Sequence, residues 1–217
     1  MITEGSMFLK NSIITLNKEK LIYRGISYDY SDFLKKVRLL KNRIIIILNE
    51  SIYIKKVDIG EGNNDLKEYI DTYIEEGFIK GEDYLMDYKI DESHSKLYVY
   101  AIKSGKMVTS LCRGAKNITV LPIQTIIMNK INKKYNTKNY TCFFSYYNVL
   151  YCIKIKDKLM EASSNISTIE EIKRKIINTN SKDTIYVTKD LEGLFNKFNV
   201  TVIPLEDWNL ISEKVFN

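Results

Sequence analysis

The stretch Arg43-Ile44-Ile45-Ile46-Ile47-Leu48 is a continuous aliphatic run, which is typical of a strand buried on both faces of a sheet. Ahead of it, apolar segments at residues 12–16 and 21–26 flank a polar turn and predict a hairpin. Between the hairpin and the run, Asp29 or Ser31 can cap a helix. The N-terminal order is therefore strand, turn, strand, helix, strand.

The same order returns in the last third of the chain. Residues 140–145 and 149–154 predict a second hairpin, and residues 158–162 predict a third strand. Two overlapping capping boxes in Ser167-Thr168-Ile169-Glu170-Glu171 predict a helix, which leads to a strand at residues 183–187. A helix capped by Asp190 and a strand at residues 200–203, ending before Pro204, complete the pattern. Helices between sheet strands imply right-handed crossovers and parallel neighbours.

The middle of the chain predicts further elements. A strand at residues 51–59 is expected to pair with the aliphatic run. It is followed by a loop at 60–64, a helix from Leu66 and two strands at 84–90 and 97–102. A short helix at 104–114, a strand at 118–121 and a helix opened by Pro122 complete this part of the chain. We interpret residues 1–6 as a cloning remnant before a native start at Met7. Residues 7–50 are expected to form the first part of a first lobe, 51–116 an inserted subdomain, 117–139 a strand and helix that return to the first lobe, and 140–217 a second lobe.

Composition sets limits on function. The net charge of +6 comes from 33 basic and 27 acidic residues that are interspersed, which is mild for a nucleic-acid binder. The lysines between Lys130 and Lys134 predict a solvated helix face, with contact to an anionic surface as the alternative. No apolar run reaches the 18 or so residues that span a bilayer, and no secretory signal is present.

The three cysteines match no zinc or redox motif. Cys142 and Cys152 lie in apolar, strand-like runs, so we expect buried thiols of a protein in a reducing cytosol. Cys112 lies within the predicted short helix.

Several stretches resemble the cytoplasmic actin-like proteins of type IV pilus and type II secretion machines, the PilM and GspL families. They are residues 43–49 with 53–57 and the helix from Leu66, residues 84–90 (YLMDYKI) with 96–103 (KLYVYAIK), and residues 182–188 (KDTIYVT). The resemblance extends from about residue 12 to residue 210. It implies an α/β fold of two ribonuclease H-like (actin-like) lobes with an inserted small α+β subdomain.

The chain departs from the nucleotide-binding members of that fold at the turns which would hold phosphate. Those proteins carry Asp-x-Gly after the first strand of each lobe, whereas the turns here are Asn17-Lys18-Glu19-Lys20 and Tyr146-Tyr147-Asn148. Neither has the glycine that lets backbone N–H groups approach phosphate, or the aspartate that would hold a metal-bound water. Thr188-Lys189-Asp190 replaces the Gly-Gly turn that faces adenosine. We therefore expect no nucleotide, metal or other cofactor.

No other group of residues predicts catalysis. His94, the single histidine, lies in a polar loop and is expected to be solvent-exposed. Asp87 and Asp91 are close in sequence but need not converge as a carboxylate pair. Gly60-x-Gly62 lacks the third glycine of a dinucleotide fingerprint and predicts a plain loop.

Tyrosine-rich strands offer two interpretations. Tyr98, Tyr100, Tyr146, Tyr147 and Tyr151 could present rings for peptide docking or base stacking. Alternatively, the 16 tyrosines reflect an AT-rich genome and half-buried strands. No catalytic, cofactor-binding or metal-binding residues are assigned, and the partner-binding residues remain unknown.

The resemblance implies a non-enzymatic cytoplasmic scaffold at the inner face of the plasma membrane. Its expected partners are a bitopic inner-membrane pilus assembly protein, whose cytoplasmic tail it would hold, and the assembly ATPase. Membrane association would be peripheral and mediated by these partners, no nucleic acid is expected, and homodimerisation stays open. The alternatives are a divergent actin-like ATPase and a basic nucleic-acid-binding module.

Overall fold

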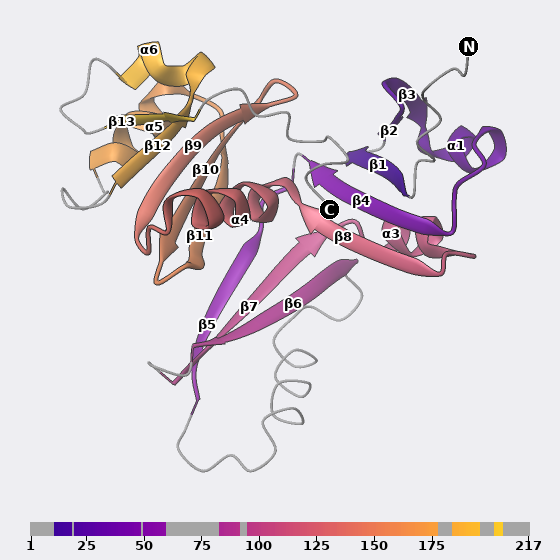
Figure 1. Cartoon of the computed structure of the whole chain (residues 1–217), viewed down its shortest axis with the longest axis horizontal. Helices are drawn as coiled ribbons and strands as arrows, with labels where there is room; N and C mark the ends of the chain where they lie inside the picture. Colours follow the sequence, from indigo (N-terminus) through magenta and orange to yellow (C-terminus); the bar gives the residue numbers. More distant parts are fainter. Residues whose placement is uncertain are drawn as a thin grey trace, which may run out of the picture. The chain divides into compact units, whose positions relative to one another are not determined.

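The computed structural model describes residues 11–18, 20–48, 50–59, 83–91, 95–177 and 184–195, together with strand β13 (Val202–Leu205). The described residues form two five-stranded sheets and one three-stranded sheet (Figure 1). The chain divides into two compact units, Met1–Asn49 with Ser104–Ile123 and Glu50–Lys103 with Gln124–Asn217. The helix predicted from Leu66 lies outside the described residues.

The sheet of the first unit has the strand order β3-β2-β1-β4-β8. Its strands are β1 (Ser12–Asn17), β2 (Lys20–Tyr23), β3 (Ile26–Asp29), β4 (Asn42–Leu48) and β8 (Asn117–Pro122). The first three strands are antiparallel neighbours, whereas β4 runs parallel to both β1 and β8. The side chains of β4 from Arg43 to Leu48 are all buried, which confirms the prediction from the aliphatic run.

Helix α1 (Tyr30–Lys36) follows β3. Asp29, one of the two predicted cap residues, lies at its N-cap position, but its side chain forms no capping hydrogen bond. Phe33 is the buried residue of this helix, and its ring meets Tyr23 and Tyr28 edge-on at centroid distances of 6.0 and 5.4 Å. Leu34, the next residue of the helix, is exposed. A seven-residue helix makes only about two turns, so a single aromatic residue anchors it.

Arg43 at the start of β4 is a buried cation. Its guanidinium donates hydrogen bonds to the carbonyl oxygens of Leu40 (2.9 Å), Leu111 and Arg113 (2.8 Å). The last two acceptors lie at the C-terminal end of helix α3 (Gly105–Cys112), where carbonyl groups lack partners within the helix and the dipole favours a positive charge. Arg43 therefore fastens α3 to β4.

The sheet of the second unit has the order β11-β10-β9-β12-β13, the same arrangement as in the first unit. Its strands are β9 (Tyr140–Tyr146), β10 (Val149–Lys156), β11 (Leu159–Ile166), β12 (Thr184–Thr188) and β13. Again the first three are antiparallel, and β12 runs parallel to β9 and β13. Pro204 was expected to follow the last strand but lies within β13, which an edge strand tolerates because one side needs no N–H donors.

Helix α4 (Ile123–Tyr135) covers one face of this second sheet. The Tyr140 hydroxyl donates to the Met128 carbonyl oxygen at 3.3 Å and to Asn132 Oδ1 at 2.9 Å, and the rings of Tyr135 and Tyr186 lie 5.0 Å apart. Pro122, predicted to open α4, is instead the last residue of β8. The buried side chains of the helix include Ile123, Ile126, Ile127 and Ile131, whose spacing places them on one face.

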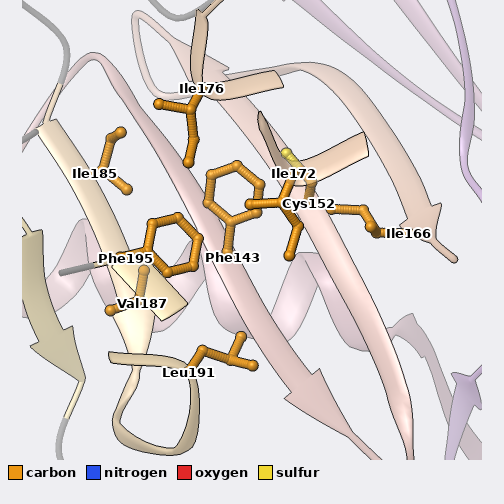
Figure 2. Close-up of a cluster of buried hydrophobic side chains, with 9 residues drawn as sticks. All are labelled: Phe143, Cys152, Ile166, Ile172, Ile176, Ile185, Val187, Leu191 and Phe195. Carbon is orange, nitrogen blue, oxygen red and sulfur yellow. The ribbon is translucent and has the colours of Figure 1, made fainter. Parts of the chain in front are cut away.

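Helix α5 (Ile169–Ile177), the short 3-10 helix η2 (Lys189–Leu191) and α6 (Glu192–Phe195) carry the apolar core of the other face (Figure 2). The core consists of Phe143, Cys152, Ile166, Ile172, Ile176, Ile185, Val187, Leu191 and Phe195. At its centre the rings of Phe143 and Phe195 lie 4.9 Å apart. Ile169 and Ile177, the first and last residues of α5, are exposed, whereas Ile172 and Ile176 between them are buried.

Of the two overlapping capping boxes predicted for α5, the one formed by Thr168 and Glu171 is confirmed. The Glu171 N–H donates to Thr168 Oγ1 at 3.2 Å, and Glu171 Oε2 accepts from the Ser167 N–H at 2.6 Å. These reciprocal bonds satisfy donors that the helix start would otherwise leave without partners.

The three-stranded sheet has the order β5-β7-β6, with all neighbours antiparallel. Its strands are β5 (Tyr53–Asp58), β6 (Tyr84–Asp91) and β7 (Lys96–Lys103). The expectation that residues 51–59 pair with the aliphatic run was wrong, because β5 pairs with β7 instead. Strands β6 and β7 form the predicted antiparallel pair.

Cys142 and Cys152 are buried as predicted, and the three cysteines are free thiols. Burial raises the pKa of Cys152 to about 12 and that of Cys142 well above its usual value.

Within the described ranges, no helix is both long and apolar enough to cross a bilayer.

Candidate functional site

The two hairpin turns that hold phosphate in nucleotide-binding actin-like proteins are tight and polar or aromatic here. In the β9–β10 turn, Tyr147 and Asn148 have φ angles of +48° and +60°, and in the β1–β2 turn Lys18 has φ +53°. Two successive left-handed residues are typical of a two-residue hairpin loop, a conformation that glycine would adopt with less strain. The rings of Tyr146 and Tyr147 meet edge-on at 4.9 Å, so aromatic side chains occupy the tip of the second hairpin.

The third predicted departure, at residues 188–190, lies where β12 passes into η2. Thr188 is buried, and its Oγ1 accepts a hydrogen bond from the Ser145 N–H at 3.3 Å. This contact ties the ends of β12 and β9 together and uses one backbone donor beside the second hairpin.

Among the residues that the structure describes, no group of three or more His, Cys, Asp or Glu side chains could hold a metal ion.

The other residues weighed from the sequence do not converge on a catalytic site. Asp87 and Asp91 lie four residues apart on one strand, so their Cα atoms are separated by about 13 Å at ~3.3 Å per residue. Lys133 and Lys134 are exposed on α4, in agreement with a solvated helix face, whereas Lys130 is half-buried and its pKa is lowered by burial. His94 and the segment from Gly60 to Gly62 lie outside the described residues.

Most of the tyrosines singled out from the sequence are not available to a partner. Tyr98 and Tyr151 are buried, and Tyr100 and Tyr146 are partly buried, with burial raising the pKa of each of the latter two hydroxyls. Only Tyr147 in this set is exposed. For four of these five residues the structure favours packing over docking.

A different set of aromatic side chains is exposed on the three-stranded sheet. The register places Tyr53 of β5, Ala101 of β7 and Met86 of β6 in one cross-strand row, with Tyr84 and Tyr88 of β6 on the same face. Tyr53, Met86 and Tyr88 are 49%, 38% and 43% exposed. We call Tyr53, Tyr84, Met86 and Tyr88 the tyrosine face.

The tyrosine face is organised around a small residue. The rings of Tyr53 and Tyr84 come from the two outer strands and meet edge-on with centroids 5.8 Å apart. Ala101 on the central strand has only a methyl group, which leaves room for the two rings to approach, and it is 1% exposed. Lys103 Nζ lies 5.8 Å from the Tyr84 ring, a cation–π contact at the rim. No described carboxylate shares this face, because Asp58, Asp87 and Asp91 project from the reverse side.

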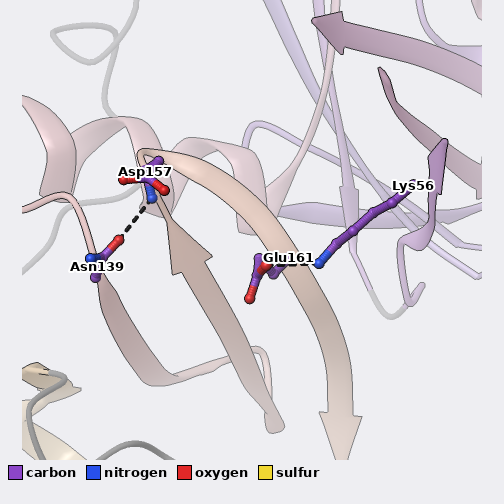
Figure 3. A network of polar contacts seen from close by, with 4 residues as sticks. All are labelled: Lys56, Asn139, Asp157 and Glu161. Atoms are coloured by element: carbon purple, nitrogen blue, oxygen red, sulfur yellow. Dashed lines mark hydrogen bonds and ion pairs between the residues drawn. The ribbon is translucent and has the colours of Figure 1, made fainter. Parts of the chain in front are cut away.

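The reverse side of the three-stranded sheet is held against strand β11 (Figure 3). Lys56 Nζ donates to Glu161 Oε1 at 2.7 Å and lies 5.6 Å from the ring of Tyr98. Nearby, the Asp157 N–H at the β10–β11 turn donates to Asn139 Oδ1 at 2.8 Å, which fixes that end of the sheet. One face of the three-stranded sheet is therefore occupied by contacts with β11. The other face holds the buried side chains of Leu97 and Val99, and beside them it exposes the rings of Tyr53 and Tyr88.

The tyrosine face was missed in the sequence because its members come from separated strands. The spacing Tyr84-x-Met86-x-Tyr88 carries a signal, since alternate residues of a strand share a face. Adding Tyr53 requires the β5–β7–β6 register, which the sequence does not provide.

Comparison with known proteins supports the fold. No protein-family model matches the chain, and no curated protein matches its sequence. Among solved structures, the chain is similar to a Bacteroides thetaiotaomicron protein with an actin-like ATPase fold and unknown function, with 12% identity, 90% of each chain covered and a TM-score of 0.57.

The chain is also similar to a chain of the PilM–PilN type IV pilus biogenesis complex, with 9% identity, 92% of this chain and 86% of that one covered, and a TM-score of 0.53. The cytoplasmic domain of EpsL, an inner-membrane component of the Vibrio cholerae type II secretion system, matches with 10% identity over 82% of this chain and 81% of that one. Its TM-score of 0.46 is too low for this match to support the fold assignment. The mixed α/β fold is thus that of the actin-like ATPases, and the resemblance predicted from the sequence is confirmed at the level of fold.

Proposed function

We propose that this protein is a non-catalytic cytoplasmic scaffold of a type IV pilus or type II secretion assembly platform. It works at the inner face of the plasma membrane, where it holds the cytoplasmic tail of a bitopic inner-membrane protein and contacts the assembly ATPase. The likeness to a chain of the PilM–PilN complex supports the assignment to this class of machine. We interpret the two five-stranded sheets as ribonuclease H-like lobes and the three-stranded sheet as part of an inserted subdomain.

The observation that carries the non-catalytic assignment is the chemistry of the hairpin turns. A phosphate cradle needs backbone N–H groups that glycine leaves accessible and a carboxylate for the metal-bound water. At the second hairpin, the corresponding positions hold Tyr146 and Tyr147, whose rings pack against each other. Thr188 accepts the hydrogen bond of the neighbouring Ser145 N–H.

Nucleotide binding tests this half of the proposal. Titration with a fluorescent ATP analogue and Mg²⁺ is expected to show no saturable binding, and ATP with Mg²⁺ is expected to leave the melting temperature unchanged. Saturable binding in the micromolar range would contradict the proposal and favour a divergent actin-like ATPase, which the overall fold accommodates.

The tyrosine face is the surface we assign to the membrane protein's tail. Tyrosine rings supply a large contact area at a low cost in side-chain entropy, and they are frequent in binding hot spots. With no described carboxylate on this face, it suits a short segment that anchors through apolar or aromatic side chains.

Binding of tail peptides tests the second half. Cytoplasmic tails of the bitopic proteins encoded beside pilin, prepilin peptidase and assembly ATPase genes are synthesised and titrated by fluorescence anisotropy. Tyr53→Ala is expected to weaken the binding of the cognate tail about tenfold. Tyr147→Ala is the matched control, because Tyr147 is 47% exposed in the same unit but lies in the turn between β9 and β10, and it should leave the affinity unchanged.

Salt dependence separates this function from the nucleic-acid alternative. Tail binding through apolar contacts should change less than about twofold between 50 and 200 mM salt, whereas a nucleic-acid complex that uses several phosphate contacts weakens steeply over the same range.

Two outcomes of the tail titration would contradict the proposal. If the Tyr53→Ala variant binds the tail as well as the unaltered protein, the tyrosine face is not the tail site. If none of the tails encoded by the neighbouring genes binds, the protein is not a scaffold of this kind.

A further inference from the structure

Strand β6 forms an edge of the three-stranded sheet. Its four central residues, Met86 to Lys89, are all exposed, although successive side chains of a strand point to opposite faces. Side chains on both faces of β6 are thus exposed at this stretch, and an edge strand offers a row of backbone N–H and C=O groups that another strand can bind.

The sequence of β6 is complementary to itself when two copies run antiparallel. If Tyr88 faces Tyr88 of a second copy, Asp87 faces Lys89 and Lys89 faces Asp87, so that two opposite-charge pairs form. On the other side of the sheet, Met86 faces Ile90, an apolar pair. Directly opposed residues on antiparallel strands have Cβ atoms about 4.5–5.5 Å apart, close enough for these pairs to interact.

This register is the favoured one among its neighbours. In an antiparallel pair, residues directly opposite each other have their side chains on the same face of the sheet. A two-fold axis perpendicular to the sheet must therefore pass through a residue that pairs with its own copy. An axis between two residues would pair each residue with its neighbour in sequence, whose side chain lies on the opposite face. Moving the axis by one residue places either Asp87 against Asp87 or Lys89 against Lys89. Like charges directly opposite each other are destabilising, so both neighbouring registers are disfavoured.

The two charges are available for this pairing. Neither Asp87 nor Lys89 forms an ion pair within the part of the chain that the structure describes, and both side chains are exposed. Charges on an edge strand commonly prevent pairing, but here their alternation matches a second copy of the same strand.

We propose that β6 pairs antiparallel with β6 of a second copy of this chain, centred on Tyr88, and joins two three-stranded sheets into one. The perpendicular two-fold axis keeps both tyrosine faces on the same side of the joined sheet. Two tail sites per dimer would then engage two membrane proteins, and the second binding event would gain from a high effective concentration. The pairing itself does not depend on the proposed function.

Sedimentation of the full chain at a range of concentrations tests the proposal. The unaltered protein is expected to show a reversible monomer–dimer equilibrium. Asp87→Lys and Lys89→Asp each convert two opposite-charge pairs into two like-charge pairs, and each is expected to weaken dimerisation about tenfold. The combined variant Asp87→Lys/Lys89→Asp restores opposite charges across the axis and should dimerise like the unaltered protein.

Dimerisation of the combined variant distinguishes self-pairing of β6 from an alternative in which its charges only prevent pairing with other strands. If the charges only block pairing, the combined variant gains nothing over the single ones, and this result would overturn the proposal. A protein that stays monomeric at all concentrations, or four proteins that dimerise equally, would overturn it too. Circular dichroism checks that each variant folds. Tail binding by the Tyr53→Ala variant is scored separately, since Tyr53 lies on β5 and its substitution should leave dimerisation intact.

Discussion

The two five-stranded sheets share one strand order but are stabilised in different ways. The second sheet packs α5, η2 and α6 through a cluster of nine buried side chains. In the first sheet, α1 buries Phe33, and α3 is fastened by the buried guanidinium of Arg43. The first sheet also buries apolar side chains, among them Ile45 of β4 and Leu111 of α3, and it adds a charged, hydrogen-bonded anchor to them. One strand order therefore accommodates both an apolar core alone and an apolar core with a buried arginine.

The largest effect expected from this comparison is in the apolar core of the second sheet. Phe143 is fully buried against Phe195, so Phe143→Ala removes a ring and leaves a cavity. We expect a loss of about 4 kcal/mol in the free energy of unfolding, measured by urea denaturation followed by circular dichroism. Phe143→Leu keeps most of the apolar volume and should cost clearly less. A loss below about 1 kcal/mol for the alanine variant would mean that this core does not hold the second sheet together.

Arg43 provides the corresponding test in the first sheet. Arg43→Met preserves much of the side-chain length but removes the donors for three carbonyl oxygens, two of them at the end of α3. The carbonyl groups would be left without these partners, and we expect a loss of about 3 kcal/mol in the free energy of unfolding, measured in the same way.

Two controls define the role of Arg43. Arg38→Met removes an exposed arginine of the same unit and should be nearly neutral. Arg43→Lys keeps the charge but not the planar fork of donors, so its stability should fall between that of the Arg43→Met variant and that of the unaltered protein. Hydrogen exchange should show that Arg43→Met loosens α3 before the second sheet. If Arg38→Met and Arg43→Met cost the same, the buried anchor has no special role.

The sequence predicted the elements that have strong local signals. The aliphatic run of β4, the hairpins and the capping box at Thr168 and Glu171 are each encoded within a few residues and are confirmed. Strand β3 was missed because Ile26-Ser27-Tyr28-Asp29 is short, polar at alternate positions and at the sheet edge, where little burial is needed. The partner of β5 was misassigned because nearness in sequence favoured β4, whereas the distant strand β7 takes that place.

The candidate site could be predicted even less well, because it is a property of register. Tyr98, singled out from its strand, points to the reverse side of the sheet and is buried near Lys56 and Glu161. Tyr53 lies in a segment with no aromatic neighbour in sequence and joins Tyr84 only through the intervening β7. Which alternate set of side chains faces outward depends on what covers each face, and this information is not local.

The smallest effect compares two ion pairs of equal length. Lys56–Glu161 and Lys36–Asp32 both have N–O distances of 2.7 Å. The first joins two strands, and its carboxylate is 18% exposed, whereas the second is a local pair on the exposed side of α1. A double-mutant cycle with Lys56→Met and Glu161→Gln should give a coupling of up to about 1 kcal/mol, and the cycle for Lys36 and Asp32 should give less.

The pH dependence of this coupling has a definite sign. Burial alone would raise the pKa of Glu161, but the hydrogen bond and charge of Lys56 outweigh burial and hold that pKa below its ordinary value of 4.5. Because the carboxyl group binds its proton more weakly in the folded protein, the pair stabilises the fold fully at pH values above 4.5, and this stabilisation is lost as the pH falls through the lowered pKa. The measured coupling should therefore be constant from about pH 8 to about pH 6 and should decrease as the pH falls below 4.5 through the lowered pKa. A coupling that persists at the acid end of this range would show that Lys56 acts through its packing on Tyr98, 5.6 Å away, and not through the carboxylate.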